Sequence, residues 1–279
     1  MLSHPETTPG ARSTWQERGA VTRFALLHLL ALSALALPWT PSAGWWLAGS
    51  YLVRMFGVTA GYHRYFSHRT YRLSRPAQFA LAFLAQTSGQ KGVLWWAANH
   101  RHHHRHADDP HDIHSPGRRG FLWAHVGWVV SDAHVAYDQT KVTDLARFAE
   151  LRWLDRHHWL PTVVFAAGTW LIGGATGFVW GYLVATVVLY HATFAINSVA
   201  HIWGTRRFPT ADQSRNNWLL ALVTLGEGWH NNHHHCMTSA KQGYRWWELD
   251  LTWIGLRALS AVGIVSGLRC FPRPLRRAA

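Results

Sequence analysis

Two long stretches without a charged residue constrain this chain most, from Phe24 to Val53 and from Pro161 to Ala200. Turn-forming residues divide each stretch, Pro-Trp-Thr-Pro-Ser at 38–42 and Gly-Gly-Ala-Thr-Gly at 173–177. A helix that crosses a bilayer needs ~20 apolar residues, with a range of about 17–25. We therefore expect four apolar helices, paired into two transmembrane hairpins, at about residues 24–39, 44–62, 159–172 and 178–198.

The distribution of basic residues predicts how these hairpins lie in the membrane. Neither turn contains Lys or Arg, and every basic residue except Arg54 lies on the other side of the hairpins. The positive-inside rule then places both termini in the cytosol. For Arg54 we expect a side chain that extends toward the membrane interface. A soluble helical hairpin is the alternative, but it leaves Trp45 and Trp46 unexplained, whereas aromatic residues at a span's end are typical of the interface.

The predicted fold class is an all-α, multi-pass integral membrane protein with one domain over residues 1–279. Residues 63–158 and 201–279 would form a helical cap on the cytosolic face. Met1–Ala20 has no apolar core of the kind found in cleavable signal peptides, which indicates a short cytosolic lead-in. Arginine far outnumbers lysine, which favours a bacterial source and hence the bacterial inner membrane as the location.

Composition excludes several classes of protein. The net charge is +13, with 27 basic and 14 acidic residues. The basic residues flank apolar segments and form no recognisable nucleic-acid-binding module, so we expect lipid headgroups and no nucleic acid as the partner. The two cysteines, Cys236 and Cys270, are too few for a disulfide framework or a thiolate-ligated cluster.

Histidines recur with fixed spacing beside the apolar segments. On a helix, positions i, i+3 and i+4 share a face, and the segments 100–104 and 230–234 both carry histidine at those three positions. A loose histidine-rich metal sponge would be unpatterned, so the repeated spacing predicts a structured metal site. A pair of histidines also follows the second apolar segment, and one histidine follows the fourth. Together with the two triplets, the candidate ligands are His63, His68, His100, His103, His104, His201, His230, His233 and His234.

Nine imidazoles suffice for two metal ions with four or five ligands each, since a structural zinc ion takes four ligands and a catalytic one about three. Imidazole without thiolate suits zinc, copper, iron or nickel. His63 and His68 lie ~140° apart on an α-helix, so we expect them to serve different ions. His102 and His235 point away from their triplets and are left out.

Four acidic residues near these segments are candidates to orient the imidazole N–H groups. The alternative is that they are solvated loop acids. The four residues are Asp108, Asp112, Asp212 and Glu227.

Together these segments resemble the motifs of membrane fatty acyl desaturases of the stearoyl-CoA type. The likeness runs from about Thr59 to Trp247, and Asp112-Ile-His114-Ser-Pro is more similar to bacterial than to vertebrate members. The matching segments are His63-Arg-Tyr-Phe-Ser-His68, His100-Arg-His-His103-His104, Arg118-Arg-Gly-Phe121, His125-Val-Gly-Trp128, Asn197-Ser-Val-Ala-His201 and Gly226-Glu-Gly-Trp-His230-Asn-Asn-His233-His234.

The resemblance implies two iron ions (Fe2+/Fe3+), O2 as co-substrate, and insertion of a cis double bond, at delta-9, into a saturated fatty acyl chain. This is a reaction of unsaturated fatty acid biosynthesis. The resemblance also implies that Asn197 contacts one iron through water and that Trp96 lines the acyl tunnel. Basic residues that could meet a phosphate-bearing carrier or a lipid headgroup are Arg69, Arg72, Arg118 and Arg119.

The reaction requires two electrons from outside, because reducing O2 to water takes four and the two C–H hydrogens supply two. The chain has no His-Pro-Gly-Gly haem motif, no Gly-rich dinucleotide fingerprint and too few cysteines for an iron–sulfur cluster. We therefore expect a separate donor, either ferredoxin, rubredoxin or cytochrome b5 with a reductase. The acyl carrier, acyl-CoA or acyl-lipid, stays open.

Two other functions compete with this interpretation. One is a di-iron membrane hydroxylase or ketolase that acts on an alkane, sterol or carotenoid. The other is a non-enzymatic membrane metal carrier, which should place ionisable residues in mid-membrane. The predicted spans hold few such residues, namely Arg54, His28 and His191.

Overall fold

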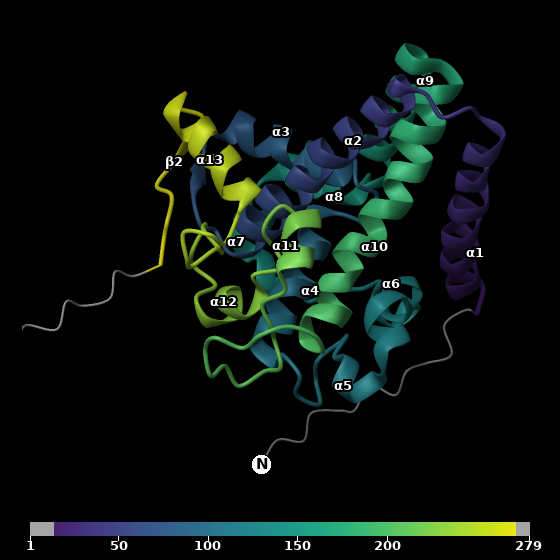
Figure 1. Cartoon of the computed structure of the whole chain (residues 1–279). Coiled ribbons are helices and arrows are strands. Elements are labelled where there is room, and N and C mark those ends of the chain that lie inside the picture. Colours follow the sequence, from purple (N-terminus) through teal and green to yellow (C-terminus); the bar gives the residue numbers. More distant parts are fainter. Residues whose placement is uncertain (1–13, 272–279) are drawn as a thin grey trace, which may run out of the picture.

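The computed structural model describes residues 14–271, and helices dominate this part of the chain (Figure 1). The regular strands in this range, β1 (Arg72–Leu73) and β2 (Val265–Ser266), form one short antiparallel pair. The expected all-α class is confirmed apart from this pair. Most of the proposed lead-in and both termini, for which a cytosolic location is expected, lie outside the described residues.

The first apolar stretch forms two helical segments joined by a short turn. Thr40 caps the second segment, because its side-chain oxygen accepts a hydrogen bond from the Ala43 backbone N–H at 3.2 Å. Pro41 follows at the first helical position, where a backbone N–H has no helical partner in any case. The turn lies where the sequence predicts it. The elements are α1 (Thr14–Ala31), η1 (Leu32–Ala36), α2 (Pro41–Phe56) and the π-helix η2 (Gly57–Ser67), which continues α2.

The second apolar stretch also reverses at its predicted turn. Gly174 has φ 55° and ψ −146°, a conformation that favours glycine. Across the two arms, Thr162 Oγ1 and the Tyr182 hydroxyl lie 3.3 Å apart. Trp46 of α2 packs closely on this hairpin, since a Cβ at Gly173 would lie 2.6 Å from its ring. The elements are α9 (Trp159–Thr176), η6 (Gly177–Val184) and α10 (Ala185–Ser198).

Two described segments are long and apolar enough to cross a bilayer, Gly19–Ala36 and Trp159–His201. The second of these contains the reversal at Gly174, so it comprises both arms of a hairpin. α2 is 16 residues long, which is short for a span by itself. The arrangement with four spans therefore stays a prediction.

The remaining elements lie in the regions expected to form the cap. Their first helix begins at Arg75, and the Ser74 side chain caps it by accepting from Ala77 N at 3.4 Å. These elements are α3 (Arg75–Gln86), α4 (Val93–His106), α5 (Pro116–Arg119), η3 (Trp123–Gly127), α6 (Trp128–Val130), η4 (Asp132–His134), η5 (Gln139–Val142), α7 (Thr143–Ala146), α8 (Ala149–Arg156), η7 (Val199–His201), α11 (Trp218–Val223), α12 (His230–His235) and α13 (Leu251–Ala261).

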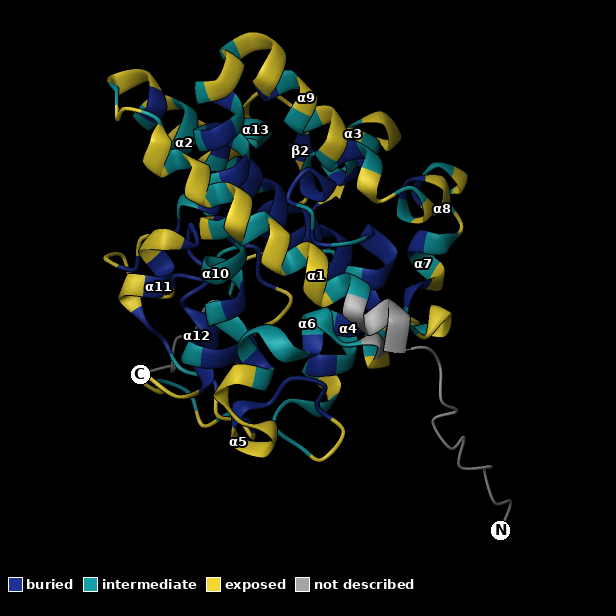
Figure 2. Ribbon diagram, turned by 90° about the vertical axis from the view of Figure 1, so that its right-hand side faces the viewer, coloured by how far each residue is buried: buried dark blue, intermediate teal, exposed yellow. Residues whose placement is uncertain are grey.

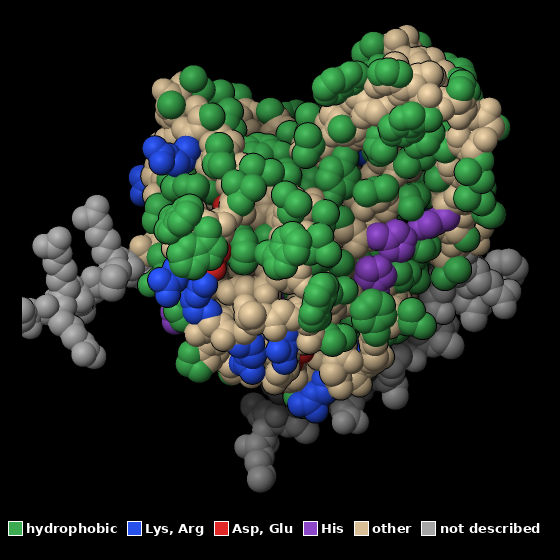
Figure 3. All heavy atoms as spheres, viewed as in Figure 1, with side chains coloured by type: hydrophobic (Ala, Val, Ile, Leu, Met, Phe, Trp, Pro, Cys, Tyr) green, Lys and Arg blue, Asp and Glu red, His purple; other side chains and the backbone are tan. Residues whose placement is uncertain are grey.

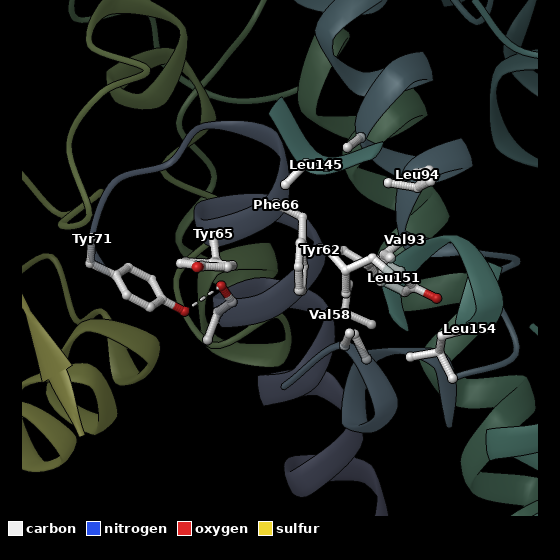
Figure 4. Close-up of a cluster of buried hydrophobic side chains, with 14 of the residues drawn as sticks. Val58, Tyr62, Tyr65, Phe66, Tyr71, Val93, Leu94, Leu145, Leu151 and Leu154 are labelled. Carbon is white, nitrogen blue, oxygen red and sulfur yellow. Dashed lines mark hydrogen bonds between the residues drawn. The ribbon is translucent and has the colours of Figure 1, made fainter. Parts of the chain in front are cut away.

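A buried apolar core joins η2 to α4 and α8 (Figure 4). Tyr62 and Phe66 of η2 are fully buried, as is Leu151 of α8, and Leu94 contributes from α4. The Tyr71 hydroxyl donates to a backbone carbonyl of η2 at 2.8 Å. Burying one large apolar side chain contributes about 1.5–3 kcal/mol. This core therefore fixes the two elements that carry the first two histidine segments.

Arg54 does not reach the membrane interface, so this expectation was wrong. Its side chain is fully buried, and Nη1 donates to Thr186 Oγ1 at 2.8 Å. The guanidinium carbon lies 4.8 Å from the ring centroid of Phe165 and 5.8 Å from that of Tyr182. α2 packs against the second hairpin, and the Arg54 side chain points into this interface. There its charge is stabilised by cation–π interactions and not by water.

Candidate metal centre

Five of the nine predicted histidines converge on one point. The Nε2 atoms of His63 and His233 lie 2.9 Å apart, and those of His233 and His104 also lie 2.9 Å apart. His68 and His100 approach each other to 2.8 Å through the same atoms. All five offer ligand atoms within 4.8 Å of one another. We call this group site A, and it comprises His63, His68, His100, His104 and His233.

His63 and His68 share site A, so the expectation that they serve different ions was wrong. That expectation assumed α-helical geometry. The residues from Gly57 to Ser67 form a π-helix, in which hydrogen bonds run from i to i+5. The backbone N–H of His68 accordingly donates to the His63 carbonyl at 3.3 Å, and the two side chains project to the same side.

The other four histidines form a second group beside the first. The Nε2 atoms of His201 and His230 lie 3.1 Å apart, and all four residues offer ligand atoms within 4.8 Å of one another. We call this group site B, and it comprises His103, His201, His230 and His234. α4 supplies His100 and His104 to site A and His103 to site B. α12 supplies His233 to site A and His230 and His234 to site B, so these two helices bridge the sites.

Each of the four predicted acidic residues accepts a hydrogen bond from Nδ1 of one histidine. Asp108 holds His201 at 2.8 Å, and Asp112 holds His103 at 3.0 Å. Asp212 holds His234 at 3.0 Å, and Glu227 pairs with His63. A carboxylate on Nδ1 fixes the ring and the tautomer. The Nε2 lone pairs are thereby directed into the two sites.

A buried ionic network supports Glu227. Arg64 Nε donates to Glu227 Oε1 at 3.1 Å, and Arg64 Nη1 donates to Asp250 Oδ2 at 3.1 Å. Gln242 Nε2 donates to the second Glu227 oxygen at 2.8 Å. Burial raises the pKa of Glu227, but His63 and Arg64 outweigh this effect and the pKa is lowered overall. Glu227 therefore stays ionised beside His63.

The environment keeps most of the clustered imidazoles neutral. Burial, reinforced by neighbouring histidines, lowers the pKa of His68, His100 and His104 well below its ordinary value, and the same causes act on His230 and His233. Only a neutral imidazole has a free lone pair for a metal ion. The arrangement therefore favours the ligating form at neutral pH.

The residues fit two bound metal ions. The facing Nε2 atoms lie 2.8–3.1 Å apart. A neutral imidazole carries only one N–H, so hydrogen bonds among these rings cannot satisfy all of the clustered nitrogen atoms. His234 shows this most directly, because Asp212 accepts from its Nδ1 while the buried Nε2 has no partner. A metal ion at each site would satisfy these lone pairs.

A cavity of about 300 Å³ reaches the metal centre from the apolar hairpins. It is lined by His100 of site A, by Trp96, which was expected to line the acyl tunnel, and by Asn197, which was expected to contact one iron through water. The Trp96 ring stacks on His100, with centroids 4.8 Å apart, and on Tyr62 at 5.3 Å. Trp96 is thus held between the core and site A, with one face of the site open to the cavity.

Comparison with known proteins decides the family. The chain matches the fatty acid desaturase family over residues 43–263, a segment that contains all nine histidines and the four carboxylates. It belongs to the fatty acid desaturase family. The chain is therefore an oxidoreductase with a fatty acyl substrate, and its histidine clusters could hold a metal cofactor.

Several similar desaturases differ in the carrier that their names give. A probable chloroplastic lipid desaturase of Arabidopsis thaliana is 36% identical, over 96% of this chain and 76% of its own length. An icosanoyl-CoA 5-desaturase of Limnanthes douglasii is 35% identical, over 92% and 74%. An sn-2 palmitoyl-lipid 9-desaturase of Nostoc is 35% identical, over 88% and 87%.

The desaturase centre includes one histidine that sequence reasoning missed. His114 is buried, its ring centroid lies 4.2 Å from that of His103, and it lines the cavity. With His103 and Asp112 it forms a third group that could hold a metal ion. It stands alone in the sequence, outside the triplets. Its place in Asp112-Ile-His114-Ser-Pro was the one available signal.

The remaining candidates lie apart from the cavity. His102 Nε2 contacts the His111 carbonyl at 2.9 Å, and His235 stacks on Phe208 at 3.9 Å, so both point away from the two sites as predicted. None of the four arginines proposed for substrate binding lines the cavity in the described part of the chain. Arg69 lies over Tyr65, Arg72 is in β1, Arg118 donates to the Asp108 carbonyl, and Arg119 lies over Trp123.

Proposed function

We propose that this desaturase uses two iron ions and O2 to insert a cis double bond, at delta-9, into a saturated fatty acyl chain. The substrate would be carried as acyl-CoA or acyl-lipid, and the product would enter unsaturated fatty acid biosynthesis. One observation carries the proposal. An apolar cavity runs along Trp96 to His100 and Asn197, so an acyl methylene in it would lie beside site A, which in turn adjoins site B.

The balance of the reaction defines what the chain must provide. A saturated –CH2–CH2– unit, O2, two electrons and two protons give the alkene and two molecules of water. Bound iron would supply the activation of O2. The nine histidines would hold the metals, the four carboxylates would fix the rings through Nδ1, and Asn197 would bind one iron through water.

The chain must also position the acyl chain and exclude water from the cavity. Correct placement of one methylene unit can supply much of the rate acceleration. Trp96, clamped between Tyr62 and His100, forms a rigid wall at the point where the cavity meets site A. The apolar lining excludes water that would compete for the oxidant.

We also propose four transmembrane helices with a cytosolic cap and both termini in the cytosol. The two turns without Lys or Arg support this topology. Tags inserted after Ser42 and after Ala175 should be reached by an impermeant reagent only from the non-cytosolic side of sealed vesicles. Reaction of either tag from the cytosolic side contradicts the topology.

An external donor would supply the two electrons. The basic cap would attract an acidic carrier such as ferredoxin, rubredoxin or cytochrome b5. Turnover with such a carrier should fall as salt rises, because charges are screened within ~8–10 Å near physiological ionic strength.

Product analysis tests the function. Purified, iron-loaded protein is incubated with saturated acyl substrates, O2, a reductase and its carrier, and the products are separated by gas chromatography and mass spectrometry. The proposal expects a cis monoene two hydrogens lighter than the substrate. A product one oxygen heavier would support the hydroxylase alternative, and sustained turnover without a donor would contradict the electron scheme.

A further inference from the structure

α1 forms the outer wall of the acyl cavity. Its residues Ala20, Arg23, Phe24 and Leu27 line the cavity, while its other face is exposed, with Leu29 64% accessible. Figure 1 shows α1 at the edge of the molecule, and Figure 2 shows its ribbon largely exposed or half-buried. A single helix therefore separates the cavity from the lipid expected around it.

A chain of three histidines joins this wall to the body of the protein. His28 Nε2 of α1 lies 3.0 Å from His191 Nε2 of α10, and His191 Nδ1 lies 3.0 Å from His125 Nε2 of η3. The chain ends at Ser198, whose hydroxyl lies 2.9 Å from His125 Nδ1. Figure 3 shows histidine side chains gathered on the hydrophobic surface between α1 and α10.

The hydrogen-bond directions in this chain are fixed for neutral rings. His28 Nδ1 donates to the Phe24 carbonyl at 2.7 Å, so His28 Nε2 is an acceptor and His191 Nε2–H donates to it. His191 Nδ1 then accepts from His125 Nε2–H, and His125 Nδ1 lies within hydrogen-bond distance of the Ser198 hydroxyl, which also donates to the Phe194 carbonyl at 3.1 Å. The three rings are thus linked in series by hydrogen bonds.

These three histidines do not form another metal site. His191 uses both of its ring nitrogens, one toward each neighbour, so the rings are linked in series. They are also absent from the groups of described residues whose ligand atoms converge within 4.8 Å. The arrangement is that of a clasp between three elements.

We infer that this clasp closes a lateral entrance between α1 and α10, and that the substrate is an acyl chain of a bilayer lipid, which enters through it. This inference rests on the proposed function and specifies its carrier. Phe24 and Phe194 line the cavity directly behind the clasp, and the rings of both lie within 6.5 Å of His191. A lipid held at the interface by its headgroup can slide an acyl chain sideways into the cavity without leaving the membrane.

Cysteine labelling in nanodiscs tests the entrance without relying on activity. The 279-residue chain carries Cys236→Ser and Cys270→Ser, and a single cysteine replaces Leu27, Leu29 or Ala82. The probe is N-dodecylmaleimide in phosphatidylcholine nanodiscs. His28→Ala removes one of the two hydrogen bonds between rings in the clasp, and His191→Ala removes both. Losing one bond should raise labelling at position 27 about fivefold, the ratio equivalent to about 1 kcal/mol, and losing both should raise it further.

The other two positions are matched controls. Position 29 faces lipid and should react quickly with or without the clasp, whereas position 82 is fully buried in α3 and should stay protected. Unchanged labelling at position 27 overturns the clasp. If position 82 becomes reactive in His191→Ala, that variant has unfolded, and His28→Ala, on the exposed helix, decides the question.

A carrier competition separates this inference from the proposed function. The iron-loaded desaturase receives palmitoyl chains either as phosphatidylcholine, phosphatidylethanolamine and phosphatidylglycerol in nanodiscs or as palmitoyl-CoA in detergent. The inference expects monoene on the lipid and at least tenfold less on palmitoyl-CoA. Monoene formed mainly on palmitoyl-CoA overturns the inference and leaves the proposed function intact. Failure with both carriers contradicts the proposed function, while the labelling result still decides the clasp.

Discussion

The imidazole ring centroids of His63 and His68 lie 4.9 Å apart at an interplanar angle of 80°, although the two residues are five positions apart in the chain. The π-helix from Gly57 to Ser67 produces this contact, because its wider turn brings positions five apart to one side. π-helical segments are rare and frequently occur at functional sites. Here the segment lets one helix deliver two neighbouring side chains to site A.

His103 and His233 should be essential, whereas their neighbours His102 and His235 should not. His103→Ala and His233→Ala each remove one candidate ligand from a buried site, so we expect desaturation to be abolished and bound iron to fall. His102→Ala and His235→Ala change side chains that face away from both sites and should retain most activity. Iron is measured by mass spectrometry of purified protein. Equal loss in all four variants would refute the helix-face argument.

The fixed spacing of histidines was the part of the site that sequence could predict. The i, i+3, i+4 rule identified His100, His103 and His104 as one face, and their side chains do lie within the two clusters. Which histidines of one helical segment share a face depends only on local helix geometry. The positions of these histidines in the sequence are therefore enough to predict it. The Thr40 and Ser74 caps and the Gly174 turn follow local rules in the same way.

Features set by packing between distant elements could not be predicted in this way. Arg54 has ordinary helical surroundings in sequence, and its burial depends on Thr186 and Phe165, more than a hundred residues away. The division of each triplet between two sites likewise requires α4 and α12 to lie side by side. His114 joins the site because a loop folds back on His103.

Arg64 should be the most important ionic residue for stability. Arg64→Met would leave Glu227 and Asp250 buried without their cation, and breaking a buried ion pair costs about 3–5 kcal/mol. We expect a large fall in the thermal midpoint in detergent. Arg75→Met is the matched control, since its pair with Glu150 is exposed and should contribute little. A fall of equal size in both variants would show that burial of the Arg64 network is unimportant.

Metal-free protein should lose stability as pH falls below about 6.5. Burial lowers the pKa of six site histidines, among them His68 and His230, so the folded state binds fewer protons than the unfolded state below the ordinary histidine pKa. Stability then rises with pH in that window, by up to about 1.4 kcal/mol per pH unit for each histidine. Burial also lowers the pKa of His103, but Asp112 and the neighbouring acids outweigh it and raise this pKa overall, which opposes the trend at one residue.

Thermal unfolding of the metal-free protein at pH 7.5 and pH 5.5 measures this dependence. The midpoint should be lower at pH 5.5. A midpoint that stays constant or rises on acidification would mean that the site histidines are not held neutral by burial.

The central claim is that two separate metal sites lie side by side, and iron stoichiometry tests it most directly. His68→Ala removes a ligand from site A, and His230→Ala removes one from site B. Purified protein is loaded anaerobically with Fe2+, desalted and analysed for iron per chain. The account predicts two iron ions in the unaltered protein and about one in each variant. A single iron ion in the unaltered protein, or loss of all iron in both variants, would contradict two separate sites.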